Sequence, residues 1–163
     1  MSTFDFSTLS PDLMLDALFH YGFDVSSGLL QLNSFENRVC QFRDDDRKSW
    51  VVKFYRPERW SDAQILEEHS FAAELMAEEV PLVGPLNLHG KTLHHAHGFA
   101  FSVSPRRGGR MPELDDAEVL EWIGRFIARI HNVGAQQDFA SRPTLDVNTF
   151  AVESRDWLME YSI

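Results

Sequence analysis

The chain has one cysteine, Cys40, among its 163 residues, and this scarcity excludes an internal disulfide. It also lacks an unbroken apolar run of the roughly 20 residues that a transmembrane helix needs. Residues 1–5 carry neither the basic nor the apolar region of a secretory signal peptide. We therefore expect a protein of the cytoplasm, where thiols stay reduced.

Positive charge is also scarce, since 15 Lys and Arg residues stand against 25 Asp and Glu residues and give a net charge of −10. This balance disfavours binding to nucleic acid or to an anionic membrane surface. Any site for phosphate groups must therefore collect its positive charge locally. Two basic clusters are present: Lys53, Arg56 and Arg59, and Arg106, Arg107 and Arg110.

The composition, 44% hydrophobic and 25% charged, is that of a globular protein, and the length fits one domain or part of a larger one. Ser10 followed by Pro11 predicts the start of a helix, which Gly22 ends. Strands are predicted at 29–32 and 38–42, with a charged loop at 43–48 before a third strand. These three strands should form an antiparallel meander.

The third strand lies within 48–57, a mostly apolar and aromatic stretch with Lys53 in its middle. Strand side chains alternate between faces, so Lys53 shares a face with Val51 and Tyr55, and the intervening residues share the other. A buried lysine needs a charged partner. A plainer interpretation is an edge strand on which the lysine stem packs while its ammonium group stays in water.

A helix is predicted over 62–79. Ser61 and Gln64 form a capping-box pattern at its start, and Pro81 follows its end. Helical spacing gathers one apolar face, which consists of Ile65, Ala72, Met76 and Val80.

One glutamate of this helix is a candidate partner for Lys53. Glu68 falls at the edge of the apolar face. The opposite, polar face holds Glu67, Glu74 and Glu78. Glu68 is therefore the acid that points inward, although a solvated carboxylate at the rim of the helix remains an alternative.

An extended linker at 80–85 leads to a predicted hairpin that turns near 89–91 and whose second strand covers 98–103. Within it, His94, His95 and His97 have the spacing of metal ligands. No cysteine or acidic residue lies in that run, so we interpret these histidines as surface residues and expect no metal site.

A second long helix is predicted from 116 to 133, followed by the start of another at 154–161. The first of these has a wide apolar stripe, formed by Val119, Leu120, Ile123, Phe126, Ile127, Ile130 and Val133. A chain that ends soon after such a helix cannot cover it with a second core, so we expect the chain to be part of a longer one and to self-associate through this stripe.

Together these motifs resemble the aminoglycoside phosphotransferase/choline kinase group. The pattern of that group is a V-x-K strand, a helix with E-x-x-x-L-x-x-L, a V-P-x-x-x-P segment and a helix ending in L-H. The matching residues are Val51 to Lys53, Glu68 with Ala72 and Leu75, Val80-Pro81 with Pro85, and Ile130-His131. More narrowly, residues 32–39, 51–60 and 65–69 resemble bacterial Ser/Thr protein kinases of this fold. The resemblance extends from about residue 10 to residue 150.

The resemblance implies an α+β fold, the small lobe of a protein kinase, with a five-stranded antiparallel sheet and one helix. An N-terminal helix precedes this lobe, and the first helical part of a truncated large lobe follows it. The implied boundaries are a small lobe at 1–103, a hinge at 104–112 and the start of the large lobe at 113–163.

The resemblance also implies an ATP site. At its phosphate end, the backbone and hydroxyl of Ser34 would cap the phosphates, Lys53 would hold the α- and β-phosphates, and Glu68 would hold Lys53. At its adenine end, Val51 would touch the base. The backbone that would pair with the adenine edge belongs to Val103, Ser104 and Pro105.

The sequence departs from the group in one respect. The catalytic loop of the group, H-G-D-x-H-x-x-N, and the metal-binding Asp that follows it in the group are absent from this sequence. The resemblance therefore covers roughly the first half of a kinase, whose catalytic residues and Mg²⁺ ligands would lie in the other half. The complete enzyme would transfer the γ-phosphate of ATP to hydroxyls of a protein substrate. Alternatives are a nucleotide-binding or regulatory module without activity, and phosphorylation of an aminoglycoside or choline-type small molecule.

We expect the 163-residue chain alone to transfer no phosphate above background, because the catalytic base and the metal ligands of the group's pattern are missing. Incubation of the purified chain with labelled ATP and Mg²⁺ tests this expectation. Autophosphorylation that depends on Mg²⁺ would contradict it.

Overall fold

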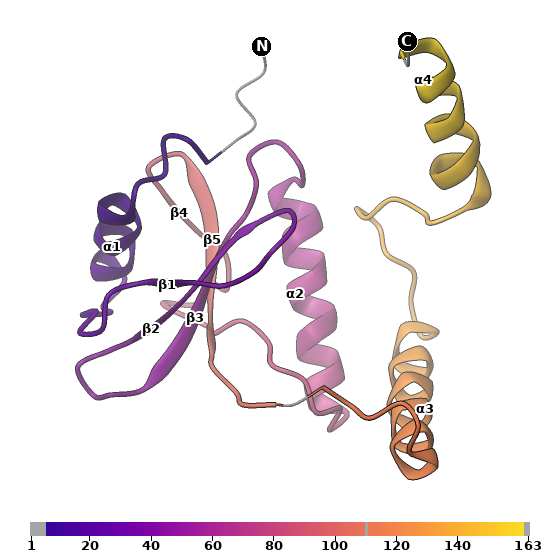
Figure 1. Ribbon diagram of the computed structural model, residues 1–163, viewed down its shortest axis with the longest axis horizontal. Helices are drawn as coiled ribbons and strands as arrows, with labels where there is room; N and C mark the ends of the chain where they lie inside the picture. The colour runs from indigo at the N-terminus through magenta and orange to yellow at the C-terminus, as the bar shows by residue number, and fades with distance from the viewer. Residues whose placement is uncertain (1–5, 110, 162–163) are drawn as a thin grey trace.

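The computed structural model describes residues 6–109 and 111–161, so Arg110 of the second basic cluster lies outside the described residues (Figure 1). Five strands form one antiparallel sheet in the order β1-β2-β3-β5-β4. Their bounds are β1 Leu30–Gln31, β2 Arg38–Arg43, β3 Ser49–Phe54, β4 His94–Ala96 and β5 Phe99–Pro105. The first three form the predicted meander, and β3 lies in the centre of the sheet.

The sheet is covered by one helix on each side (Figure 1). Helix α1 (Pro11–His20) begins at Ser10, whose side chain accepts the backbone N–H of Leu13, as the cap pattern predicts. Its apolar residues join Val52 and Phe54, both fully buried, in the main core. Val52 and Phe54 therefore occupy the face of β3 opposite Lys53, as alternation predicts.

Helix α2 (Asp62–Ala77) covers the other face and begins with the predicted capping box between Ser61 and Gln64. The predicted apolar face was only partly right. Ile65 is buried with Tyr55 and Leu93, but Met76 is half exposed, and the buried residues include His69 and Leu75. The helix has two buried surfaces: Ile65 and His69 face the sheet, while Leu75 packs with Val80 and Val133.

The predicted turn near 89–91 is present, because Leu88 and Lys91 exchange backbone hydrogen bonds of 2.8 and 3.1 Å around His89 and Gly90, which both have positive φ. The prediction was wrong in one respect, since this turn does not lead into the strand at 98–103. The strands β4 and β5 turn instead at His97-Gly98, where both residues have positive φ, 52° and 83°. A two-residue hairpin with both central residues at positive φ matches the natural twist of the strands. β5 also continues to Pro105, two residues past the predicted end.

The interpretation of all three histidines as surface residues was wrong for His94. His95 and His97 are exposed and lie beside Asp62 and Asp16. His94 is buried, with its ring centroid 4.5 Å from that of Tyr21 and 5.6 Å from that of Phe101. Within the part of the chain that the structure describes, its Nε2 atom has no hydrogen-bond partner. Alternation along β4 turns His94 toward the core and His95 away from it.

The remaining helices follow in the C-terminal part. Helix α3 (Ala117–Gly134) begins at Asp116 and contacts α2 through its last turn, where Val133 is buried. A π-helical turn, Asn148–Val152, then leads into α4 (Glu153–Tyr161). Along the stripe of α3, Leu120 and Ile127 are exposed. Self-association through this stripe stays a prediction. No helix among the described residues is both long and apolar enough to cross a membrane.

Burial should make the stability of the fold depend on pH. Burial, followed by the nearby charges of His89, His95 and Lys91, lowers the pKa of His94 below its usual value. Below about pH 6.5, the usual pKa of histidine, the unfolded chain binds a proton at His94 more readily than the folded chain does. The free energy of unfolding is therefore unaffected above that pH and decreases as the pH falls toward the lowered pKa of the folded chain. His69, whose pKa burial also lowers, acts in the same direction.

We expect the free energy of unfolding to fall between pH 7 and pH 5, and to fall less steeply in His94→Leu. Urea unfolding at a series of pH values measures this slope. His131→Leu, at an exposed position on α3, is the control and should keep the slope of the original chain. A His94→Leu chain with an unchanged slope would show that His94 does not carry the effect.

Candidate functional site

Lys53 and Glu68 meet between β3 and α2, as predicted. The Nζ atom of Lys53 lies 3.5 Å from Oε1 of Glu68, and their side chains are 33% and 44% exposed. The alternative of a lysine on an edge strand was wrong, because β3 is flanked by β2 and β5. The pair is thus carried by the centre of the sheet and by the helix that covers it.

Below Lys53 lies a buried polar network that the sequence analysis missed. The Nζ atom is 4.6 Å from the ring centroid of Tyr55, whose hydroxyl is 2.8 Å from Nε2 of His69 and 3.2 Å from Oγ of Ser102. His69 Nδ1 lies 2.9 Å from Oγ1 of Thr92. Burial raises the pKa of Tyr55 to about 12, so its hydroxyl stays protonated. The position of His69, four residues after Ile65, was the available signal that it faces the sheet.

At the other end of the same face lies a pocket of about 440 Å³. Val51, Ser104 and Pro105, three of the residues assigned to adenine, line it together, and Val51 pairs directly with Ser104 across the sheet. Lys53 follows Val51 on the same face, about 7 Å further along the strand. The structure therefore places a partly apolar pocket and a lysine in line along β3.

Val103 differs from the other residues expected at adenine. Its side chain is fully buried in the main core, on the opposite face of the sheet. Its carbonyl oxygen already accepts the backbone N–H of Leu86 at 2.7 Å. Since β5 runs to Pro105 and the N–H of Arg106 still donates to the Ser49 carbonyl, the backbone leaves the sheet later than the expected hinge start at 104.

The loop that contains Ser34 is attached to the residues after β3. The Ser34 hydroxyl donates within its own loop to the Asn37 carbonyl, and the Asn37 side chain accepts the backbone N–H of Arg56 at 3.1 Å. Glu36 pairs with Arg59, which lowers the pKa of the Glu36 carboxyl. The loop leads directly into β2, where Val39 pairs with Lys53. The loop therefore lies at the end of β3 that carries Lys53, and these contacts hold it there.

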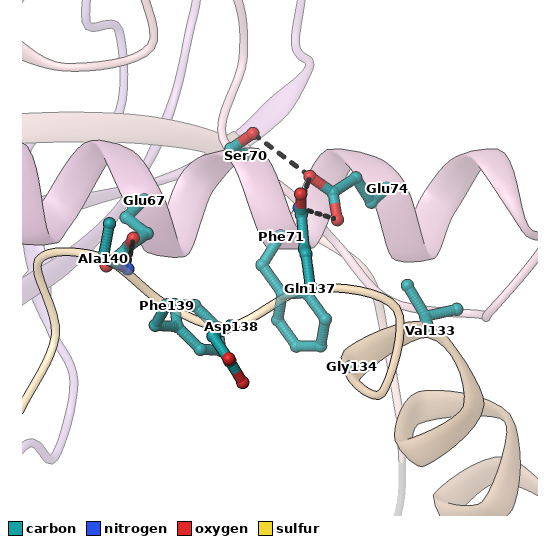
Figure 2. A pocket seen from close by; sticks show the side chains of 10 residues that line it. All are labelled: Glu67, Ser70, Phe71, Glu74, Val133, Gly134, Gln137, Asp138, Phe139 and Ala140. Atoms are coloured by element: carbon teal, nitrogen blue, oxygen red, sulfur yellow. Dashed lines mark hydrogen bonds between the residues drawn. The ribbon is translucent and has the colours of Figure 1, made fainter. Parts of the chain in front are cut away.

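On the polar face of α2, two of the glutamates bind the C-terminal part of the chain, which the helical pattern did not predict. The Glu67 carboxylate accepts the backbone N–H groups of Ala140 at 2.5 Å and of Arg142 at 2.8 Å, and Glu74 accepts the Gln137 side chain at 2.9 Å. A pocket of about 260 Å³ lies here between α2 and the segment after α3 (Figure 2). This face of α2 therefore holds the chain that follows α3.

Arg142 reaches the site from that segment, and no pattern in the sequence indicated this contact. Its guanidinium group donates to Oε2 of Glu68 and, at 3.1 Å, to the Gln64 carbonyl. It also lies over the Trp60 ring, 4.6 Å from the centroid. Glu68 consequently has one cation at each carboxylate oxygen.

The described residues do not fit a metal site. Across 6–109 and 111–161, no group of three or more His, Cys, Asp or Glu side chains lies close enough together to hold a metal ion.

Comparisons of sequence place the chain among phosphotransferases. Residues 28–161 match the model of the phosphotransferase enzyme family. Stress response kinase A of Escherichia coli K12 is 51% identical over 154 residues, which cover 94% of this chain and 47% of that protein. A serine/threonine protein kinase, RdoA, of Salmonella typhimurium LT2 is 47% identical with the same coverage. The chain thus spans about half the length of these curated relatives.

Solved structures resemble the fold. An amicoumacin kinase in complex with AMP-PNP, Ca²⁺ and Ami superimposes with a TM-score of 0.70 at 18% identity, over 94% of this chain and 54% of that one. A microcompartment-associated aminopropanol kinase gives a TM-score of 0.71 at 17% identity, over 91% and 49%. At such low identity these structures establish the fold alone, a kinase-like lobe with a five-stranded sheet.

We expect Glu67→Gln to loosen the segment after α3. Glutamine keeps one acceptor oxygen but loses the charge and the second acceptor, so the backbone N–H groups at 140–142 are less well held. Hydrogen exchange should become measurably faster at these amides and stay unchanged in the first turn of α2. Glu78→Gln, at the exposed end of α2, is the matched control. Unaltered exchange at 140–142 in Glu67→Gln would refute the role of Glu67.

Proposed function

Since the chain belongs to the phosphotransferase enzyme family, we propose that it is the ATP-binding half of a cytoplasmic kinase that phosphorylates serine and threonine hydroxyls of proteins. The observation that carries this proposal is the Lys53–Glu68 pair, in line with the pocket of Val51, Ser104 and Pro105. A lysine in the central strand with a glutamate in the covering helix is the arrangement that kinases use to hold nucleotide phosphates.

Each part of the nucleotide has a matching surface in this proposal. Adenine enters the pocket beside Val51, where the backbone near Ser104 and Pro105 is at hand for its edge. Lys53 meets the α- and β-phosphates, and Glu68 keeps the lysine in place. The loop at Ser34 closes over the phosphates from the end of β3. In a chain of net charge −10, Lys53 supplies local positive charge for this anion.

The acceptor in this proposal is a protein, and the support is the names of relatives with about half of their residues identical. The small-molecule kinases of similar fold are less than 20% identical and do not favour a small acceptor. In the same proposal, residues 1–103 form the small lobe, 104–112 the hinge, whose first two residues still pair with β3, and 113–163 the start of the helical lobe. The base and the Mg²⁺ ligands come from the remainder of the kinase.

We expect Lys53→Met to weaken binding of a nonhydrolysable ATP analogue by about tenfold, because a charged hydrogen bond to phosphate is lost. Glu68→Gln should weaken it less, since it only releases the lysine. Isothermal titration calorimetry measures both affinities, and circular dichroism checks that the variants fold.

The matched controls are Lys91→Met and Glu78→Gln, which remove the same charges at exposed positions away from the site. Both should bind the analogue as the original chain does. The proposal fails if Lys53→Met binds the analogue as tightly as Lys91→Met, or if Glu68→Gln and Glu78→Gln have equal effects.

A further inference from the structure

The carboxylate of Glu68 is shared between two cations that come from different parts of the chain. Lys53, on β3, lies 3.5 Å from Oε1. Arg142, after α3, donates to Oε2. Charge-assisted hydrogen bonds between a cation and a carboxylate are normally about 2.7–2.9 Å long, so Lys53 is the more loosely held partner.

Arg142 is also the more firmly anchored cation. Its backbone N–H donates to Glu67, its Nε donates to the Gln64 carbonyl, and its guanidinium stacks over Trp60. Its side chain is 24% exposed, less than that of Lys53 or Glu68. A planar guanidinium held at several points orients a carboxylate, whereas an ammonium group on a flexible stem does not.

The charges explain why a second cation matters at a phosphate site. Lys53 and Glu68 alone are neutral as a pair, and a neutral pair attracts an anion weakly. With Arg142 these three side chains carry one net positive charge, and the carboxylate of the neighbouring Glu67 is already bound by the backbone N–H groups of 140–142. Because Arg142 already neutralises one side of Glu68, Lys53 can turn toward another anion without leaving the carboxylate unpaired.

A second set of contacts connects Arg142 with the loop at Ser34. The Trp60 ring that lies under the guanidinium donates its Nε1–H to Glu36 at 3.4 Å. Glu36 belongs to the same loop as Ser34 and pairs with Arg59, which itself lies 4.8 Å from the Trp60 ring centroid. Arg142 is thus in contact with residues that hold both Lys53 and the loop.

We propose that Arg142 is a positioning residue for nucleotide phosphates: it holds one oxygen of Glu68, so that Lys53 stays in place but remains available to the phosphates. This inference rests on the proposed function, and it adds a residue from the segment after α3 to the phosphate site. Arg142 acts through Glu68 and Lys53 and does not touch the nucleotide.

The first test compares a nonhydrolysable ATP analogue with adenosine, which lacks phosphates. Arg142→Gln should weaken binding of the analogue by about two- to fivefold and leave adenosine unchanged, a modest effect because the ion pair is partly exposed. Combined with Lys53→Met or Glu68→Gln, Arg142→Gln should cause no further loss of affinity for the analogue, because Arg142 acts on the phosphates only through Glu68 and Lys53. Arg142→Lys, which keeps the charge, should restore part of the affinity.

The matched control is Arg129→Gln, which also removes an arginine that ties the C-terminal part to α2, but at the Glu78 carbonyl and away from Glu68. It should leave both affinities unchanged. Equal losses for the analogue and adenosine, or a full loss that persists in the Lys53→Met background, would show a merely structural role and overturn the inference.

The second test needs no nucleotide. Without Arg142, both carboxylate oxygens of Glu68 are available to the Lys53 ammonium, so Lys53 is engaged more fully and its acetylation by an amine-reactive ester should slow relative to Lys48 and Lys91 in the same chain. In Glu68→Gln it should become faster. Unchanged or faster acetylation of Lys53 in Arg142→Gln would overturn the inference. If the original chain binds neither ligand, the proposed function fails, while the acetylation rates still decide the role of Arg142.

Discussion

The alternation of side chains along β3 is the constraint on which the rest of the structure depends. β3 is the central strand of the sheet, and because α1 covers one of its faces and α2 the other, each face must meet a different partner. Val52 and Phe54 join the main core beneath α1, and Lys53 and Tyr55 face α2. A shift of one residue in register would exchange these faces and place the lysine in the apolar core. Burial of the core therefore also fixes the position of the lysine.

Helix α2 connects the sheet with the C-terminal part of the chain. One side packs on the sheet through Ile65 and places His69 on Tyr55. Another side binds backbone N–H groups of the segment after α3 through Glu67, and its last turns pack on Val133. Glu68 lies between these two sides. Its carboxylate consequently responds to both parts of the molecule, which is why a cation from each reaches it.

Most of the elements, and the central pair of the site, could be predicted from the sequence. Caps such as Ser61 with Gln64, and the two-residue period around Lys53, report interactions within a few residues of chain. The predictions that were wrong concerned the second hairpin and the burial of one histidine. The hairpin turn at His97-Gly98 was obscured by the Gly90 turn signal nearby. His94 was taken as exposed because three neighbouring histidines suggested a surface, although alternation turns one of them inward.

The sequence by itself determined where helices α1, α2 and α3 begin, and which faces carry Lys53 and Glu68, because these depend on local propensity and on the period of each element. Only the tertiary structure decided that Arg142 shares Glu68 and that Glu67 holds the segment after α3. The residues of the Glu68–Arg142 pair are 74 positions apart. Periodicity shows which way a side chain points, but the distant segment that it meets is chosen by packing of the whole chain.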